Sequence, residues 1–354
     1  MTSRTNIGLP FKEWPIEDRR LWSAAFDGTD IFADHEAADL APSTVFGRQA
    51  AYSLFLGFLQ AVSPELLASS PAERVTLRLI EDYVGYLRQN CRDTTVVIEL
   101  ERLFFVIRNF FPDRDWTWLY RICRRIAYDA KPIKHQEIMS PDLYRLGLSL
   151  MDSALAKTER AGHLSKSIAF RFRDGLLIAL LIEAPMRRRA LSRLRIDQHL
   201  ERRAARWCVI VPGKLSKNGV PQDFKLSLRL SAYVDTYLET IRPAFPGAST
   251  HFSLWPYLGR PMTDRMIWRR IIKWTKEKLG FSVSPQRFRN ACATFLVMQD
   301  PANAHAARDL LGHKSFNMTQ KHYIDRAQSR MAGRKLSNVL SKLKMGPSSP
   351  DPSA

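Results

Sequence analysis

The sequence predicts a mainly α-helical protein of two domains, with a small β-hairpin or sheet in the second domain. Three observations support this prediction. The chain has 354 residues, of which 45% are hydrophobic, and this is enough for two folded cores. Apolar residues recur at spacings of three and four along most of the chain, as they do in amphipathic helices. Only two short segments, 207–211 and 224–228, have the composition or alternation of strands.

The first domain is predicted to be an all-helical bundle over residues 43–130. Residues 1–42 before it are rich in Asp, Pro and Gly and show little periodicity, so we expect a loosely ordered arm there. Proline and Arg-Asp turns separate the candidate helices, which are Thr44–Val62, Ala72–Gln89, Thr94–Phe111 and Trp116–Tyr128. Residues 131–139 are basic and contain proline, which is typical of a linker.

The second domain is predicted over residues 140–345. Two helices, Pro141–Arg160 and Ser165–Glu183, begin it, and helical character continues through Arg187–Leu194. The two strand-like segments then enclose residues 212–219, a hairpin with lysines near its tip. The later helices are expected at Ser231–Arg242, Thr263–Leu279, Pro285–Gln299, Ala304–Leu311 and, with one apolar side, Gln328–Leu343. Residues 346–354 are predicted to form a disordered tail.

The charge of the chain indicates a polyanionic partner. Its formal net charge is +19, and nucleic acid is the commonest partner of such a protein. An acidic membrane surface is the rival interpretation, but no apolar run has the length of a membrane span, and the polar start has no signal-peptide core. The four cysteines have no metal-binding or redox spacing, so we expect reduced packing residues and a cytoplasmic protein.

Two basic clusters contain candidate phosphate ligands. Arg187 follows a nearly uncharged helix, so it can be held rigidly and present two parallel hydrogen bonds to a phosphate. In the segment 284–291, Gln286 and Arg289 lie one helical turn apart on one face, whereas Arg287 points elsewhere. The alternative for the cluster that begins with Arg187 is a solvated basic face, and this is the interpretation we take for Arg188, Arg189, Arg193 and Arg195.

Three further residues have a chemistry that fits phosphodiester cleavage. Lys214, in the predicted hairpin, can protonate a leaving oxygen, although an ordinary surface lysine is the commoner explanation. His313 and Tyr323 lie near the end of the chain, where a tyrosine can act as a nucleophile beside a phosphate. Either of them alone is more often a structural residue, and only the order and combination favour a catalytic role.

In that order, the residues resemble the tyrosine recombinase (phage integrase) family. The resemblance rests on Arg187, Lys214, the Gln286-x-x-Arg289 pair, Leu311-Gly312-His313 and Tyr323. It covers the chain from about Ser140 to Leu343, which it identifies as an α+β catalytic domain. The helical domain before it is similar to the core-binding domain of the family in position and helicity.

The resemblance implies a site-specific recombinase or integrase that forms a 3′-phosphotyrosyl bond with DNA. It assigns the nucleophile to Tyr323, phosphate stabilisation to Arg187 and Arg289, and the general acid to Lys214. It further implies that His313 stabilises the phosphate or assists proton transfer, and that Gln286 donates a hydrogen bond to it. No cofactor or metal is expected. The implied partners are double-stranded DNA and further copies of the chain, as a tetramer on paired sites, with the helix after Tyr323 docked on a neighbour.

Several positions depart from the pattern of the family. Gln286 replaces the usual histidine and cannot shuttle a proton, and Asn290 and Ala190 also replace commoner residues. Pro185 stands in place of a glycine, and His322 occupies the commoner position of the nucleophile, one residue before Tyr323. We therefore expect activity but retain the alternative of a catalytically lapsed DNA-binding protein of the same fold. A relaxing topoisomerase with related chemistry is a minor third alternative.

Overall fold

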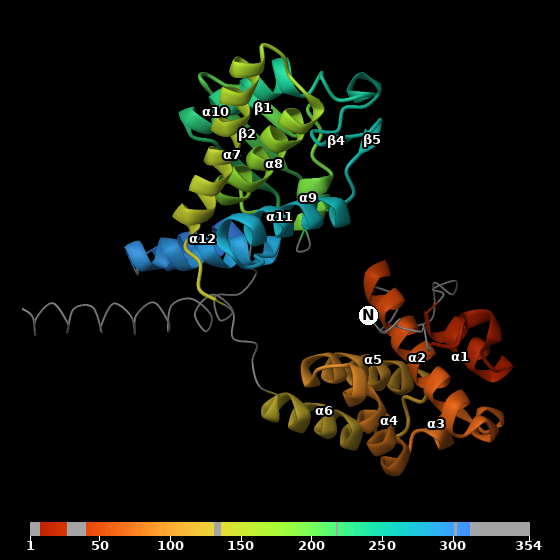
Figure 1. Ribbon diagram of the computed structural model, residues 1–354. Coiled ribbons are helices and arrows are strands. Elements are labelled where there is room, and N and C mark those ends of the chain that lie inside the picture. Colours follow the sequence, from red (N-terminus) through yellow and green to blue (C-terminus); the bar gives the residue numbers. More distant parts are fainter. Residues whose placement is uncertain (1–7, 27–39, 131–135, 217–218, 301–302, 312–354) are drawn as a thin grey trace, which may run out of the picture. The chain divides into compact units, whose positions relative to one another are not determined.

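The computed structural model divides the chain into two compact units, Met1–Lys134 and His135–Ala354, and each is described here by itself (Figure 1). The boundary falls within the expected linker. The structure describes residues 8–26, 40–130, 136–216, 219–300 and 303–311. Within these ranges, no helix combines the length and the apolar character that a membrane span requires.

The first unit is entirely helical in its described parts. Its elements are η1 (Phe11–Glu13), α1 (Ile16–Phe26), α2 (Pro42–Val62), η2 (Pro64–Ala68), α3 (Pro71–Arg74), α4 (Leu77–Asn90), α5 (Asp93–Phe110) and α6 (Thr117–Asp129). They enclose one core that is rich in aromatic rings, among them Trp22, Tyr52, Phe55 and Phe110. The predicted helical domain is therefore present, and two details of its prediction need correction.

The expectation of a loosely ordered arm over residues 1–42 is wrong for residues 8–26. Trp14 and Trp22 are buried, and the Trp14 ring packs edge-on against Tyr52 at 5.0 Å between centroids. The buried Asp18 carboxylate accepts hydrogen bonds from the Tyr52 hydroxyl at 2.6 Å and from Arg74 Nη1 at 2.7 Å. Trp14 packs against Tyr52 of α2 and Trp22 against Phe110 of α5, and the small number of these apolar residues in a polar background explains why the sequence pattern missed them.

The helix predicted over Ala72–Gln89 is two helices, α3 and α4. Ser70 and Glu73 form a capping box that starts α3, and the Thr76 hydroxyl accepts a hydrogen bond from the Leu79 N–H at 3.3 Å to start α4. Side-chain caps of this kind satisfy backbone N–H groups at a helix start, so the chain begins a new helix at each of them.

The second unit combines helices with two small antiparallel sheets. In order, it contains α7 (Ser140–Ala161), α8 (Lys166–Glu183), α9 (Arg188–Ser192), β1 (Leu200–Arg203), β2 (Arg206–Val211), η3 (Gly213–Leu215), β3 (Gln222–Lys225), α10 (Leu228–Thr236), the π-helical turn η4 (Tyr237–Ile241), η5 (Ala248–Thr250), β4 (Pro256–Tyr257), β5 (Arg260–Pro261), α11 (Asp264–Leu279), α12 (Pro285–Gln299) and α13 (Ala304–Leu311). The mainly α fold with a small sheet agrees with the prediction.

Helix α8 is the buried centre of the second unit and packs closely against α7. Two glycines allow this approach, because a Cβ on Gly147 would lie 2.7 Å from the Ala179 nitrogen and one on Gly175 would lie 2.7 Å from the Gly147 oxygen. Side-chain contacts hold α8 to its other neighbours. Its Asp174 carboxylate is buried and accepts hydrogen bonds from Arg173 Nη2 at 2.7 Å, from Arg270 Nε at 2.6 Å and from Trp274 Nε1 at 2.8 Å, which ties α8 to α11.

The larger sheet has three strands in the order β1-β2-β3, with Leu200 opposite Val209 and Val209 opposite Phe224. The sequence pattern missed β1, because three of its four residues are charged and exposed. Strand β3 begins and ends earlier than predicted. The Ser227 hydroxyl caps the next helix through the Leu230 N–H at 3.1 Å, so Leu228 begins α10 and the predicted helix start at Ser231 is three residues late.

The remaining predicted segments cannot be compared with the structure. The amphipathic helix at Gln328–Leu343 and the tail at 346–354 lie outside the described residues.

Candidate active site

Arg187 stands on a short buried connector between α8 and α9. The connector is a tight turn in which the Met186 N–H donates to the Ala184 oxygen at 2.6 Å, and the side chains of Ala184 and Met186 are buried. After Arg187, helix α9 is held in place by Leu191, whose carbonyl accepts a hydrogen bond from Trp255 Nε1 at 2.8 Å. The backbone on both sides of Arg187 is therefore fixed, as the apolar helix before it predicts.

The guanidinium of Arg187 is half-buried and carries positive charge that the described part of the protein does not balance. Burial lowers the pKa of Arg187, and no described carboxylate acts in the opposite direction. By contrast, its neighbour Arg188 pairs with Asp264 at 2.9 Å. A fixed, partly desolvated arginine without a described carboxylate is suited to bind an anion in two parallel hydrogen bonds.

Arg289 lies on α12 and is buried, with 1% of its surface exposed. Its Nη1 donates a hydrogen bond to the carbonyl of Pro185, two residues before Arg187. Its Nη2 donates to the carbonyl of Leu311 at 2.7 Å, two residues before His313. One guanidinium thus joins the Arg187 connector to the end of α13 through two backbone carbonyls.

Lys214 lies exposed in η3, a tight turn between β2 and β3. The Leu215 N–H donates to the Pro212 oxygen at 2.9 Å, and the Leu215 side chain packs against the core of the second unit. A Cβ on Gly213 would lie 2.4 Å from the Gly219 oxygen, so the two sides of the turn can approach only because Gly213 has no side chain. The lysine is thereby held on an anchored turn.

The last turn of α13 is the common neighbour of these segments. Gln222 begins β3, the strand that follows the Lys214 turn. Its side chain donates a hydrogen bond to the Leu310 carbonyl at 3.0 Å. Arg289 binds the next carbonyl, that of Leu311. The structure therefore brings together the chain segments that carry Arg187, Lys214 and Arg289, and Figure 1 shows α9, α11 and α12 at the same end of the second unit.

The other predicted residues of α12 differ in their surroundings. Gln286 lies exposed on the first turn of the helix, one turn before the buried Arg289. Arg287 points elsewhere, as predicted, and donates hydrogen bonds to the carbonyls of Ser282 at 3.1 Å and Gln136. Asn290 is exposed.

His313 and Tyr323 lie outside the described residues, so the structure assigns no position to either. The last described residue, Leu311, is within the site, and the sequence places His313 two residues beyond it.

Sequence reasoning missed the groups that assemble the site. The carbonyls of Pro185, Leu310 and Leu311 and the side chain of Gln222 hold the segments together. Every residue has a backbone carbonyl, so a contact made by a carbonyl cannot be recognised from the residue type in a sequence. Gln222 is the first residue of β3, next to charged residues, and no sequence pattern distinguishes it.

Comparisons with known proteins were made for the whole chain. Residues 157–330 match the sequence model of the phage integrase family. A lambda integrase dimer bound to a COC′ core site is 14% identical, with 91% of this chain and 79% of that chain covered at a TM-score of 0.55. A lambda integrase (75–356) dimer bound to a COC′ core site is 15% identical, with coverages of 81% and 90% and a TM-score of 0.54. XerA recombinase is 17% identical, with coverages of 84% and 93% and a TM-score of 0.42. No curated protein matches the chain. At these identities, the two lambda integrase structures show a shared fold.

Proposed function

Residues 157–330 place this chain in the phage integrase family of tyrosine recombinases, and on that premise we propose that it is a site-specific DNA recombinase or integrase. In this proposal it cuts and rejoins DNA strands through a covalent 3′-phosphotyrosyl intermediate. The observation that supports the proposal best is the convergence of the segments bearing Arg187, Lys214 and Arg289 on the end of α13. The fixed positive charge of Arg187, which no described carboxylate balances, is what a phosphodiester transition state requires.

The cleavage step conserves the energy of the broken bond. The Tyr323 hydroxyl oxygen attacks the scissile phosphorus in line, so an O–P bond to the tyrosine forms while the bond to the 5′-oxygen breaks. The Lys214 ammonium gives its proton to the departing 5′-oxygen, and the tyrosine proton passes to water or to His313. Rejoining reverses each transfer, with a 5′-hydroxyl of the partner strand as nucleophile. Because the phosphotyrosyl bond stores the energy, the reaction needs no nucleotide cofactor and no metal.

The two arginines have different tasks in this scheme. Arg187, half-buried on its rigid connector, binds the non-bridging oxygens of the scissile phosphate directly. Arg289 holds the Arg187 connector and the end of α13 in register and adds positive charge behind the phosphate. Gln286 donates a hydrogen bond to a phosphate oxygen from the exposed first turn of α12.

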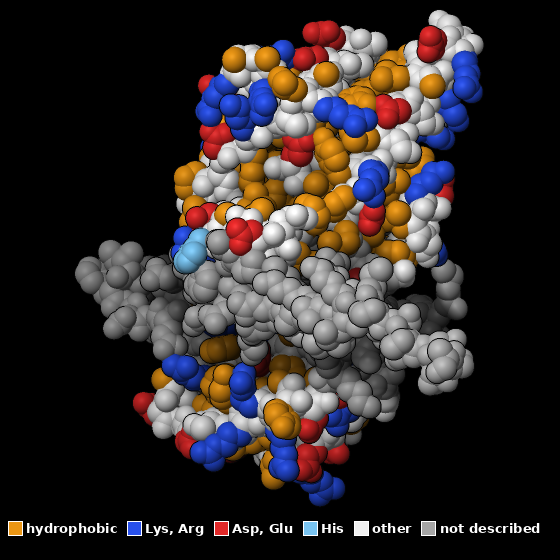
Figure 2. Space-filling model, turned by 90° about the vertical axis from the view of Figure 1, so that its left-hand side faces the viewer, with side chains coloured by type: hydrophobic (Ala, Val, Ile, Leu, Met, Phe, Trp, Pro, Cys, Tyr) orange, Lys and Arg blue, Asp and Glu red, His pale blue; other side chains and the backbone are white. Residues whose placement is uncertain are grey.

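DNA is proposed to contact both units through exposed basic residues. Helix α6 of the first unit, which we assign as the core-binding domain, exposes Arg121, Arg124 and Arg125, and α11 of the second unit exposes Arg265, Arg269 and Lys276. Lys and Arg side chains are visible on both units in Figure 2. Double-stranded DNA is therefore the expected ligand, with an affinity that falls steeply as salt rises, because each neutralised phosphate releases counterions. The structures of lambda integrase are dimers on DNA, and we propose a tetramer on paired sites for this chain. The proposal places the protein in the cytoplasm, associated with the nucleoid.

Covalent trapping on nicked DNA tests the proposal. The DNA carries the ends of the mobile element that encodes the protein, and wild type is compared with Tyr323→Phe under denaturing conditions. We expect an adduct from wild type and none from the variant, with equal DNA binding by both in a mobility-shift assay.

The same assay separates the alternatives. Binding by both proteins without an adduct from either indicates the catalytically lapsed DNA-binding protein that Gln286, Asn290 and Ala190 favour. Relaxation of supercoiled plasmid regardless of its sequence indicates a topoisomerase instead.

A further inference from the structure

A buried histidine lies at the base of the turn that carries Lys214. His199 has 5% of its surface exposed and directly precedes β1. Its backbone carbonyl accepts a hydrogen bond from the Ile210 N–H at 2.9 Å, which extends the pairing of β1 with β2 by one residue toward the turn. Strand β2 ends one residue later, at Val211, and Pro212, Gly213 and Lys214 follow.

The hydrogen bonds of the ring fix its protonation state. The backbone N–H of Arg195 donates to His199 Nδ1 at 2.9 Å, so this nitrogen is an acceptor and the ring proton lies on Nε2. The backbone N–H of His199 donates in turn to the backbone oxygen of Arg195 at 3.0 Å. Two hydrogen bonds between these residues therefore close the loop between α9 and β1. A protonated ring cannot keep this arrangement, because both of its nitrogens are donors.

The charges around the ring also oppose its protonation. Burial lowers the pKa of His199 below its ordinary value of 6.5, and the positive charges of Arg195 and Lys214 act in the same direction. Asp197 acts in the opposite direction, but it pairs with Arg195 at 2.8 Å. At neutral pH the ring is therefore uncharged, and the positive charge of Lys214 contributes to keeping it so.

We propose that His199 is a positioning residue for Lys214. Its neutral ring supports the base of the turn from which the lysine donates its proton, and it does so without a carboxylate that would bind the ammonium. This inference rests on the proposed function, in which Lys214 is the general acid. The observations that carry it are the buried ring, its bond to the Arg195 N–H and its place beside the end of β2.

Two cleavage substrates distinguish this role from a general contribution to folding. One is the ordinary nicked DNA, and the other has sulfur in place of the scissile 5′-oxygen. A thiol has a pKa of about 8.5, so a thiolate leaves without help from a general acid. For His199→Ala we expect the single-turnover rate on the oxygen substrate to fall by about 10- to 100-fold, a part of the effect of a general acid. On the sulfur substrate the variant should match wild type, as should Lys214→Ala.

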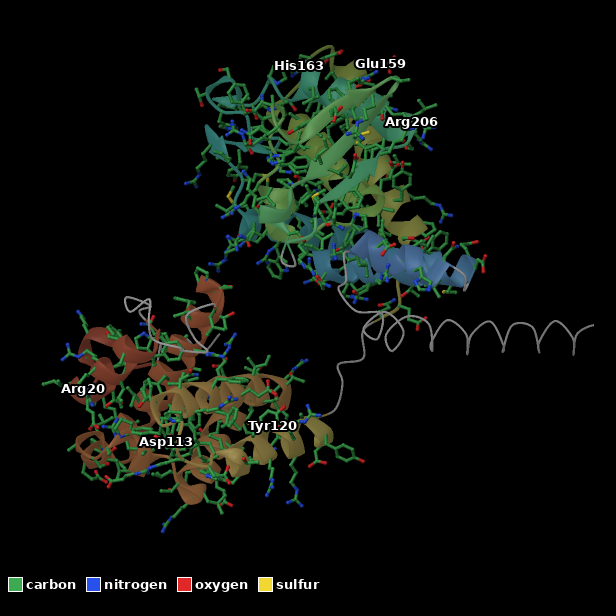
Figure 3. The ribbon with its side chains drawn as sticks, turned by 180° about the vertical axis from the view of Figure 1, so that it is seen from behind. Arg20, Asp113, Tyr120, Glu159, His163 and Arg206 are labelled. Atoms are coloured by element: carbon green, nitrogen blue, oxygen red, sulfur yellow. The ribbon has the colours of Figure 1, made fainter. Side chains whose placement is uncertain are left out.

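Two matched variants complete the design. His199→Asn keeps a neutral acceptor for the Arg195 N–H and should restore most of the rate on the oxygen substrate. His163→Ala removes an exposed histidine that Figure 3 shows at the far end of the second unit from α9 and α12, and it should leave both rates unchanged. Equal slowing of His199→Ala on both substrates would overturn the proposal.

A titration by nuclear magnetic resonance tests the electrostatic effect of Lys214 on His199 without any measurement of activity. The ring of His199 is followed in protein labelled at histidine, in wild type and in Lys214→Gln. Because the lysine charge disfavours the imidazolium, its removal should raise the pKa of His199. An unchanged pKa contradicts the inference even if the enzyme is active. If wild type forms no adduct on either substrate, the proposed function fails, and the titration still decides whether His199 senses Lys214.

Discussion

The second unit holds buried arginines in two different ways. Around Asp174, the guanidinium groups of Arg173 and Arg270 share one carboxylate, which also accepts a hydrogen bond from Trp274. At the end of the unit that contains α9 and α12, Arg289 binds the carbonyls of Pro185 and Leu311, and Arg187 pairs with no described carboxylate. Arg173 and Arg270 are thus paired with a carboxylate, whereas Arg187 has no carboxylate partner among the described residues.

We propose that this difference separates a structural region from an anion-binding region. A buried arginine that meets a carboxylate contributes to holding helices together, whereas a desolvated arginine without one costs free energy in the free protein. That cost is recovered when an anion binds. The contrast therefore supports the proposed phosphate site more strongly than the number of basic residues does, since exposed basic residues lie on both units.

Loss of the Asp174 carboxylate is expected to have the largest effect on the free energy of unfolding. Asp174→Asn leaves two arginines with a neutral partner, and breaking a buried pair in this way costs about 3–5 kcal/mol of unfolding free energy. Denaturation by urea measures it, with Asp142→Asn as control. Asp142 pairs with Arg145 at 2.8 Å on the surface, so the control should change stability by less than about 1 kcal/mol. Equal effects of the two changes would contradict the distinction.

Removal of Arg187 should slow cleavage strongly without lowering stability. Arg187→Ala is expected to slow cleavage by about 100- to 1000-fold, which is typical for the loss of one donor to a transition-state oxyanion. Its free energy of unfolding should stay the same or rise, because an unbalanced, partly buried charge is removed. Rapid-quench cleavage and urea denaturation of the same preparation measure the two quantities. A large loss of stability would show that Arg187 is a structural residue.

A smaller effect is expected from Arg287, two residues before Arg289. Its hydrogen bonds to Ser282 and Gln136 join loops and do not reach the site. Arg287→Ala should cost about 1 kcal/mol of stability, the usual value of such hydrogen bonds, and leave cleavage within about threefold of wild type. Arg289→Ala, measured in parallel, should abolish cleavage. Similar rates for both variants would remove the basis for assigning Arg289 to the site.

The smallest expected signal is the reactivity of a single thiol. Burial raises the pKa of Cys292 to about 12, and its sulfur contacts the Ile182 carbonyl at 3.5 Å. At pH 8 this thiol is protonated and covered, so a disulfide reagent should modify the half-buried Cys91 first and Cys292 only on unfolding. Peptide mapping after timed modification measures the order. Early labelling of Cys292 would mean that α12 opens in the native protein.

The sequence predicted those parts of the site that depend on local pattern. An apolar helix followed by arginine predicts the rigid placement of Arg187, and glycine and lysine between two strands predict the Lys214 turn. The sequence could not predict that Arg289 would bind Pro185, because that contact joins residues 104 positions apart through a backbone carbonyl. Nor did the pattern reveal β1 and α1. Strand β1 is charged on most of its length. The few apolar residues of α1 can be recognised as core residues only once their packing in the core of the first unit is known.

Replacement of the scissile phosphate by a methylphosphonate tests the central claim most directly. This group lacks the negative charge that Arg187 is proposed to neutralise, while it keeps the leaving oxygen that Lys214 is proposed to protonate. On this substrate Arg187→Ala should react at nearly the wild-type rate, and Lys214→Ala should remain slow. If Arg187→Ala is as slow on methylphosphonate DNA as on ordinary DNA, the unbalanced charge of Arg187 does not serve the phosphate, and the account of this site is wrong.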